Sequence, residues 1–158
     1  VREALFSSLE SQLGGWDGVR FLDAFAGSGA VGLEALSRGA AHATFIERNR
    51  RTSDLIRRNA GVVGEGESDV VAAPAQEALE SLSREFDAVF LDPPYDYADD
   101  DLAAVLASMV RRDLLADDAV LVVERASRSG EPDWPDGVEG VRAKKYGSTR
   151  LWYGRRRR

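Results

Sequence analysis

The fold of this chain is decided by residues 22–32, which read Leu22-Asp23-Ala24-Phe25-Ala26-Gly27-Ser28-Gly29-Ala30-Val31-Gly32. A buried strand is predicted over residues 19–24, and a helix over residues 30–37. The glycines between and within them fit the spacing G-x-G-x-x-G. Glycine lets the backbone turn sharply after the strand and lets a ligand approach the peptide groups closely. This stretch therefore predicts the first strand, loop and helix of a nucleotide-binding α/β sheet.

Strand and helix patterns continue to alternate along the chain. Helices are predicted over residues 2–13, 30–37, 50–60, 76–84 and 102–115, and strands over residues 19–24, 43–47, 70–73, 87–91, 119–124, 141–146 and 149–153. Such alternation predicts parallel strands with helices on both faces. The last two strands meet at Gly147-Ser148 and form an antiparallel hairpin. We expect one α/β domain over residues 1–158 with a mostly parallel, seven-stranded central sheet.

Composition excludes several classes of protein. The 158 residues are 44% hydrophobic and 30% charged, as in ordinary soluble domains. No apolar run approaches the roughly 20 residues of a membrane helix. The chain has no cysteine and a single histidine, which excludes disulfides and metal centres built on thiolates or several histidines. We expect a cytoplasmic, monomeric protein without a metal, and we place His42 in a solvated loop before the second strand.

The charge is unevenly distributed. A net charge of −6 argues against a general polyanion binder. Residues 142–158 nevertheless hold eight basic side chains and no acidic one, and five arginines lie between residues 48 and 58. Two interpretations stay open. The basic side chains form a solvated helix face and a frayed tail, or they contact phosphates, for which arginine is well suited.

Two carboxylates accompany the glycine turn. Glu47 ends the second predicted strand, 20 residues beyond Gly27, where a carboxylate can accept the hydrogens of both ribose hydroxyls. The glycine spacing alone does not separate dinucleotides from S-adenosylmethionine (SAM). Asp23 favours SAM, because its negative charge would repel a pyrophosphate but can bind the ammonium of a methionine moiety.

A second motif, Asp92-Pro93-Pro94-Tyr95, directly follows the strand predicted over residues 87–91. The two prolines fix two φ angles and remove two donors, so the carbonyls of Asp92 and Pro93 have set directions. The Asp92 carboxylate and the Pro93 carbonyl can accept both hydrogens of an exocyclic amine, and Tyr95 can stack on its base. Ligands of such sheets bind at the carboxyl ends of the strands, where both motifs lie. We therefore predict a methyl donor beside a nucleobase amine.

These two motifs together resemble the class I SAM-dependent amino-methyltransferases. The chain is more closely similar to the bacterial RsmD-type 16S rRNA guanine-N2 methyltransferases. That closer similarity lies in the blocks Val1-Arg2-Glu3-Ala4-Leu5-Phe6, Gly32-Leu33-Glu34-Ala35-Leu36-Ser37-Arg38-Gly39-Ala40, Val123-Glu124 and Tyr146-Gly147-Ser148-Thr149. The resemblance implies a Rossmann-like fold, SAM as cofactor and, as partner, 16S rRNA or the assembling small ribosomal subunit. It implies methylation of a guanine N2 amine of the guanine-966 type.

The resemblance also implies roles for individual residues. Asp23, Phe25, Gly27, Ser28 and Gly29 would hold the methionine part of SAM. Further cofactor contacts would come from Glu47 at the ribose, Arg48 beside the adenine, and Ala75 and Gln76 at the adenine edge. Related enzymes often carry an acid where this chain has Gln76. The catalytic loop would be Asp92, Pro93, Pro94 and Tyr95. The family usually has a basic N-terminal hairpin ahead of the Val1 block, which this sequence lacks.

Alternatives remain for function and for single residues. The same loop serves DNA adenine-N6 methyltransferases, a nicotinamide-dependent oxidoreductase would use the same glycine spacing, and a silent RNA-binding module would use neither chemistry. Asp96, Asp99, Asp100 and Asp101 suit a helix N-terminus better than a metal site. Tyr97 either lines the base pocket or lies at the surface. The tryptophans Trp16, Trp134 and Trp152 are expected to be packing or edge residues.

Overall fold

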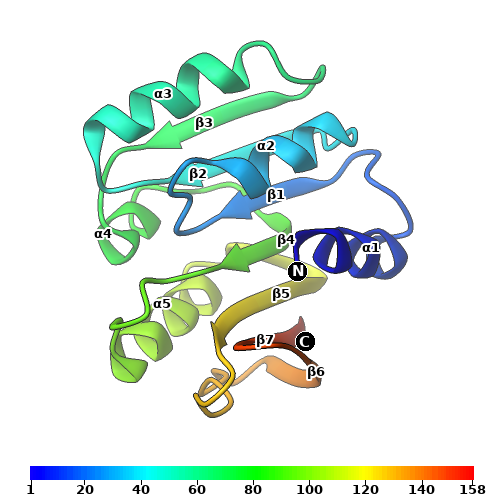
Figure 1. Ribbon diagram of the computed structural model, residues 1–158, viewed down its shortest axis with the longest axis vertical. Coiled ribbons are helices and arrows are strands. Elements are labelled where there is room, and N and C mark those ends of the chain that lie inside the picture. The colour runs from blue at the N-terminus through cyan, green and yellow to red at the C-terminus, as the bar shows by residue number, and fades with distance from the viewer.

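A seven-stranded sheet runs through the centre of the computed structural model, which describes residues 1–158 (Figure 1). The strand order is β3-β2-β1-β4-β5-β7-β6. The strands are β1 (Arg20–Asp23), β2 (His42–Ile46), β3 (Glu67–Val71), β4 (Phe86–Leu91), β5 (Leu115–Ala126), β6 (Val138–Tyr146) and β7 (Thr149–Arg156). Neighbouring strands from β3 to β5 are parallel, whereas β7 is antiparallel to both β5 and β6. The predicted sheet and its closing hairpin are confirmed.

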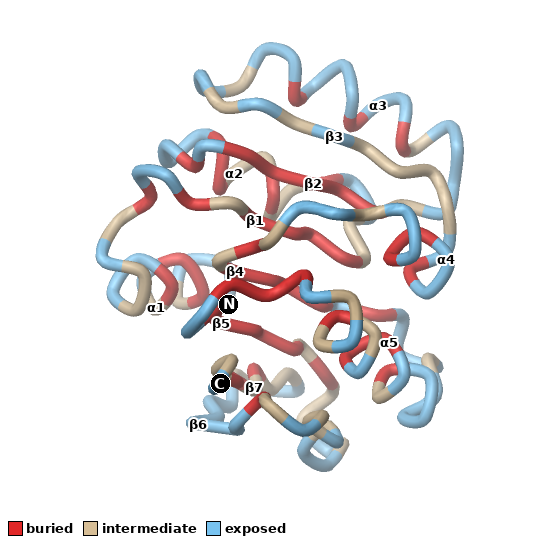
Figure 2. Tube along the Cα trace, turned by 180° about the vertical axis from the view of Figure 1, so that it is seen from behind, coloured by how far each residue is buried: buried red, intermediate tan, exposed pale blue.

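The helices lie on both faces of this sheet. They are α1 (Arg2–Leu13), α2 (Ala30–Ser37), α3 (Arg50–Ala60), α4 (Ala75–Leu79) and α5 (Asp99–Arg111). Apolar residues of α1, α2 and α3 pack on one face, and those of α4 and α5 pack on the other. Consecutive residues of a strand supply opposite faces: Phe21 lies in the first core, and Leu22 lies in the second. Because both faces are covered, β4 and β5 are mostly buried, apart from the exposed Asp117 and Asp118 near the start of β5 (Figure 2).

The chain reverses its course across the sheet between β1 and β4. From β1 it proceeds outward through β2 to β3, and it then returns to build β4 and β5 on the other side of β1. In open α/β sheets the loops on either side of such a reversal diverge and leave a crevice at the carboxyl ends of the strands. The glycine loop follows β1, and the Asp92 loop follows β4. The topology therefore brings the two sequence motifs to one crevice.

Several predicted boundaries were wrong. The third strand is β3, Glu67–Val71 instead of 70–73, and the fifth strand, β5, extends from Leu115 to Ala126 instead of 119–124. The helix predicted over 102–115 is α5, which already begins at Asp99 and ends at Arg111. The helix predicted over 76–84 is α4, which ends at Leu79.

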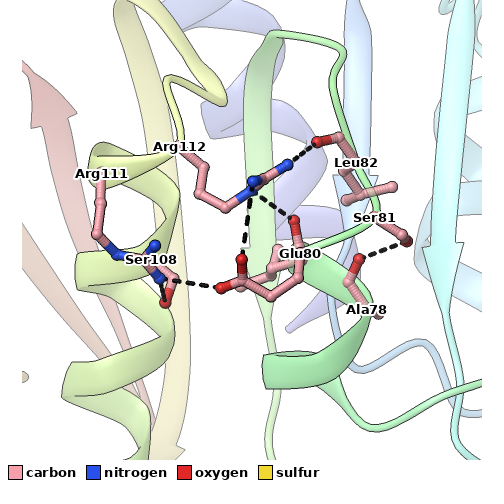
Figure 3. Close-up of polar contacts among 8 residues, drawn as sticks. Ala78, Glu80, Ser81, Leu82, Ser108, Arg111 and Arg112 are labelled. Carbon is pink, nitrogen blue, oxygen red and sulfur yellow. Dashed lines mark hydrogen bonds and ion pairs between the residues drawn. The ribbon is translucent and has the colours of Figure 1, made fainter.

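A polar cluster explains why α4 is short (Figure 3). Arg112, just beyond α5, donates to the backbone oxygens of Leu79 (3.1 Å) and Leu82 (2.7 Å). Arg111 reaches Glu80 at 3.0 Å. Carbonyls at a helix end need partners, and here a distant arginine supplies them. The cluster fastens the end of α4 to α5 and so positions the start of α4, which lies at the candidate site.

His42 was placed wrongly by the sequence interpretation. It is the first residue of β2, is buried, and its Nε2 lies 2.9 Å from Asp69 Oδ2 on β3. Every residue of β2 is buried, and His42 is buried with the rest of the strand. His42 is therefore part of the scaffold, remote from the loops at the carboxyl ends.

Candidate active site

Four carboxylates lie in a row across the carboxyl ends of adjacent parallel strands. In spatial order they are Glu47 after β2, Asp23 at the end of β1, Asp92 after β4 and Glu124 near the end of β5. The strand register brings them together. Asp23 is paired with Phe90, two residues before Asp92, and Leu91 is paired with Val123, so that Asp92 and Glu124 each follow a paired residue. Such a row gives the crevice a strongly acidic floor. No group of histidine, cysteine or acidic side chains in residues 1–158 has the arrangement of a metal site.

The glycine loop between β1 and α2 leaves its backbone open to a ligand. Gly27 and Gly29 have φ angles of 54° and 84°, which glycine adopts without strain. A Cβ added at Gly27 would meet no atom within 4 Å, and Gly27 and Ser28 are exposed. The loop is nevertheless held in place, since the Ala26 amide donates to the Ile46 oxygen at 2.8 Å. The loop is thus a fixed rim with accessible peptide groups.

Asp23 lies beneath this loop. Its side chain is 1% exposed, and Oδ2 accepts a hydrogen bond from the Gly32 amide at 3.0 Å, at the first turn of α2. Burial raises the pKa of Asp23 to about 7, the Gly32 hydrogen bond opposes that rise, and the charges of Asp92 and Glu47 add to it. A buried carboxylate in this state gains from any cation that enters the crevice. The environment of Asp23 therefore suits an ammonium ligand.

Glu47 connects the glycine loop to β2 and α3. Its Oε1 accepts from the Gly27 amide at 3.1 Å, and its Oε2 accepts from the Asn49 amide at 2.7 Å. A carboxylate has about four acceptor positions, so two remain for ligand hydroxyls. The structural bonds hold the carboxylate at the crevice in a single orientation.

An apolar cavity opens beside Glu47. Phe25 and Tyr97 form one wall, with ring centroids 5.1 Å apart in an edge-to-face arrangement. The lining comprises Ala24, Phe25, Ile46, Glu47, Arg48, Ala73, Pro74, Ala75, Pro94 and Tyr97. We name it the first cavity. Apolar walls with two charged groups at the mouth suit a flat ring attached to a polar sugar. Gln76 is exposed and lies outside this lining, whereas Ala75 and Tyr97 belong to it.

The Asp92 loop separates the first cavity from a second one. Pro94 lines the first cavity, whereas Asp92, Pro93 and Tyr95 line the second. Tyr95 is 90% exposed, so its ring is available for contact. Asp92 makes no hydrogen bond within the protein, and partial desolvation raises its pKa above the ordinary value. The loop therefore places the Asp92 carboxylate at the second cavity with its acceptor positions free.

The second cavity also contains a carboxylate that the sequence interpretation gave no role. It is lined by Asp92, Pro93, Tyr95, Glu124, Arg125, Ala126, Ser129, Ser148 and Thr149. Burial, and then the charge of Asp92, raise the pKa of Glu124 to about 7. The available signal was an acid placed within the apolar strand pattern of residues 119–124. The pattern showed that Glu124 is a polar residue in an otherwise apolar strand, but it did not show that Asp92 lies beside it.

Arg125 supports the segment that follows the Asp92 loop. Its buried guanidinium donates to the Tyr97 oxygen at 3.0 Å and to Asp99 Oδ1 at 2.7 Å. Asp99, Asp100 and Asp101 form the acidic first turn of α5, as the sequence predicted. Tyr97 is therefore fixed on both sides, by Arg125 at its backbone and by Phe25 at its ring. Trp16 is buried in the core, as expected of a packing residue.

The basic C-terminal segment divides into two parts. The interpretation of the C-terminal arginines as a frayed tail was wrong, because β7 extends to Arg156 and the last two arginines form ion pairs. Arg157 lies 3.0 Å from Asp118, and Arg158 pairs with Asp117. No ion pair holds the hairpin cations Arg142, Lys144, Lys145 and Arg150. Lys145 and Arg150 lie directly opposite each other on β6 and β7, and Arg150 stacks over Trp152 at 5.4 Å.

Comparison with known proteins places this arrangement in a family. The family model described as "Conserved hypothetical protein 95" matches residues 1–155. The chain belongs to this family. Over 135 residues it is 37% identical to "Ribosomal RNA small subunit methyltransferase D" of Escherichia coli strain K12; the match covers 85% of this chain and 66% of that relative. The chain therefore spans just under two thirds of this curated relative's length.

Solved structures agree on the fold. "Putative methyltransferase yhhF" from Escherichia coli superposes with a TM-score of 0.88 at 34% identity, covering 99% of this chain and 86% of the other. The magnesium protoporphyrin IX methyltransferase of Synechocystis PCC 6803, solved with bound SAM, gives a TM-score of 0.71 at 15% identity, covering 98% and 79%. This family member thus has the class I SAM-dependent methyltransferase fold. No helix in the structure combines the length and apolarity that crossing a membrane requires.

Proposed function

We propose that this protein transfers a methyl group from SAM to the exocyclic N2 amine of a guanine in 16S rRNA. The observation that carries the proposal is the position of the Asp92–Tyr95 loop between two cavities. One is mainly apolar and is lined by Ala24 and Phe25, just before the glycine turn, and the other is lined by the carboxylates of Asp92 and Glu124. A methyl transfer needs donor and acceptor on either side of a shared boundary, with the reacting atoms about 3–3.5 Å apart. The loop has the groups to define that boundary.

The residues of the first cavity and the glycine loop fit the cofactor. The buried Asp23 suits its ammonium, Glu47 suits its ribose hydroxyls, and the walls from Phe25 and Tyr97 suit its adenine. Arg48 and Ala75 would border that ring. The exposed backbone at Gly27 and Ser28 would accommodate the methionine chain, and the buried Gly29, whose added Cβ would lie 3.1 Å from Ile56, would complete the turn beneath it. When bound, SAM supplies an electrophilic methyl group.

The chain's own contribution is to prepare the amine. Asp92 and the Pro93 carbonyl would accept the two amine hydrogens, which draws the nitrogen lone pair out of conjugation with the ring. The raised pKa of Asp92 favours uptake of the proton that the amine releases. Tyr95, with its exposed ring, would stack on the base and orient it.

An RNA substrate is supported by the name of the relatives and by the hairpin beside the second cavity. Lys145 and Arg150 are directly opposite each other and unpaired, an arrangement that is unfavourable unless an anion lies between or near them. Their hairpin turn contributes Ser148 and Thr149 to the cavity lining. A phosphodiester backbone passing the hairpin would therefore deliver an extruded base to Asp92.

The test is identification of the methylated nucleoside. The protein is incubated with labelled SAM and either small-subunit RNA, small subunits, or duplex DNA, and each product is digested to nucleosides. The proposal predicts N2-methylguanosine from an RNA substrate. N6-methyladenine in DNA would establish the rival methyltransferase instead. Thermal stabilisation by NAD and none by SAM would establish an oxidoreductase.

A further inference from the structure

Glu124 has no hydrogen-bond donor or ion-pair partner in the folded chain although it is partly buried. It lies on β5, which is central in the sheet, and its neighbours Val123 and Arg125 are buried. Glu124 is only partly buried, and its carboxylate oxygens remain accessible from the cavity. Arg125, the adjacent cation, is engaged with Asp99 and the Tyr97 oxygen. Glu124 therefore presents free acceptor positions to a ligand in the cavity.

Glu124 faces the same cavity as Asp92. The two residues follow neighbouring parallel strands, and the register Leu91–Val123 makes them adjacent at the sheet edge. Neighbouring strands lie about 4.8 Å apart. Two carboxylates at that spacing can accept from two adjacent donors on one edge of a planar base. The donors are closer together than the carboxylates, but two hydrogen bonds of about 2.9 Å can diverge from the base edge and span the difference.

Guanine presents such a pair of donors. Its Watson–Crick edge carries N1–H next to the N2 amine, whereas adenine has a bare acceptor at N1 beside its amine. A carboxylate next to Asp92 can accept a hydrogen bond from the N1–H of guanine, whereas it is repelled by the N1 lone pair of adenine. Resting on the proposed function, we propose that Glu124 is the specificity-determining residue that accepts the N1–H of the target guanine while Asp92 holds the N2 amine.

The burial of Glu124 supports this role. Desolvation and then the nearby Asp92 charge raise its pKa to about 7, and the positive charge of the chain's N-terminus only partly opposes that rise. A guanine N1–H hydrogen bond would compensate the negative charge of Glu124. Donation to an ionised, partly buried acceptor is among the stronger hydrogen bonds in proteins.

The experiment replaces the hydrogen-bond donor at N1 of the target base with an acceptor. Two matched RNA substrates carry guanine or 2-aminopurine at the target position; 2-aminopurine keeps the amine at C2 but has an acceptor at N1. The wild-type protein and the variant Glu124→Gln are assayed on both at pH 8, where the Glu124 carboxyl is mostly ionised. Glutamine can donate to N1 of 2-aminopurine. Glu65→Gln, an exposed acid in the loop before β3, is the control.

We expect the wild type and Glu65→Gln to prefer guanine by roughly 10–100-fold in kcat/KM, the effect of one hydrogen bond to a charged group. Glu124→Gln is expected to lose most of its activity on guanine and to bring the preference within about threefold of unity. SAM affinity and melting temperature, measured in parallel, are expected to remain near wild type or to rise.

Two results overturn the inference, and they are distinguishable. If the wild type methylates guanine N2 and Glu124→Gln keeps the same preference for guanine over 2-aminopurine, Glu124 does not read N1 although the proposed function stands. If the wild type methylates no guanine amine in any RNA substrate, the proposed function fails and this inference fails with it. Should Glu124→Gln not fold, Glu124→Asp serves, with a weakened preference expected from its shorter reach.

Discussion

The two loops of the crevice differ in how many of their polar groups form hydrogen bonds within the protein. The glycine loop is held by bonds from within: Asp23 binds the Gly32 amide, and Glu47 binds the Gly27 amide. The Asp92 loop leaves its functional groups free, with no internal hydrogen bond at Asp92 and with Tyr95 almost fully exposed. A small cofactor of constant shape benefits from a preformed site, because less ordering is needed on binding. The partner of the second loop is expected to bring the missing donors itself.

The largest test of this difference is Asp92→Ala. We expect kcat to fall by about 10³-fold or more, since both the amine acceptor and the proton acceptor are lost. SAM affinity, measured by calorimetry, is expected to stay within about threefold of wild type, because Asp92 supports no part of the cofactor site. A large loss of SAM affinity would instead assign Asp92 to the cofactor and remove the distinction between the loops.

The glycine loop is expected to respond to pH through Asp23. Its folded-state pKa of about 7 lies above the ordinary value of 3.8, so the unfolded chain releases this proton first as pH rises. The free energy of unfolding therefore falls between about pH 4 and pH 7, by on the order of 2–4 kcal/mol. Asp23→Asn, which keeps an acceptor for Gly32, is expected to flatten that fall in urea titrations. Glu124, shifted in the same direction, leaves a residual slope. An unchanged slope in Asp23→Asn would show that Asp23 is not the titrating group.

Two glycines of the same motif provide a matched pair for packing. A Cβ at Gly32 would lie 2.4 Å from the Phe45 ring, whereas a Cβ at Gly27 meets nothing within 4 Å. We expect Gly32→Ala to lower the free energy of unfolding by about 1–3 kcal/mol through overpacking. Gly27→Ala is expected to cost about 1 kcal/mol, from its left-handed backbone alone. Equal effects in chemical denaturation would contradict the view that Gly32 is needed for helix–sheet contact.

The smallest expected effect concerns the hairpin. Lys145→Glu is expected to weaken RNA binding by roughly tenfold at low salt and to reduce the slope of log affinity against log salt by about one. Arg84→Glu is the control, because Arg84 is exposed and lies near residues of β3, the edge strand farthest from the hairpin. Filter binding over a salt series measures both. An equal loss in both variants would indicate a general charge effect and would not support a phosphate site at the hairpin.

The sequence was sufficient wherever local pattern decides structure. Apolar runs bounded by glycines predicted the strands, and strand-end motifs predicted that the glycine turn and Asp92 share one crevice. The sequence-based prediction failed where residues far apart in the chain determine the local structure. Arg112 satisfies carbonyls at the end of α4 from about 30 residues away, and Asp118 pairs with Arg157 across 39 residues. The early end of α4 and the ordered tail were missed for this reason.

The candidate site divides in the same way. Glu47 was found because its distance from Gly27 along the chain is a signal in itself. Glu124 gained no role because its meaning depends on Asp92, which lies on a neighbouring strand and is 32 residues earlier in the chain. Ala75 and Gln76 were assigned together by resemblance; Ala75 lines the first cavity, Gln76 is exposed beside it, and the contact of Gln76 with the adenine stays a prediction.

The most direct test of the account is a crystal structure of the protein with SAM bound. We expect the adenine between Phe25 and Ala75, the ammonium beside Asp23, and the methyl group pointing past Pro94 toward the cavity that contains Asp92 and Glu124. A methyl group directed away from that cavity, or SAM bound with its methionine outside the glycine loop, would contradict the proposed transfer.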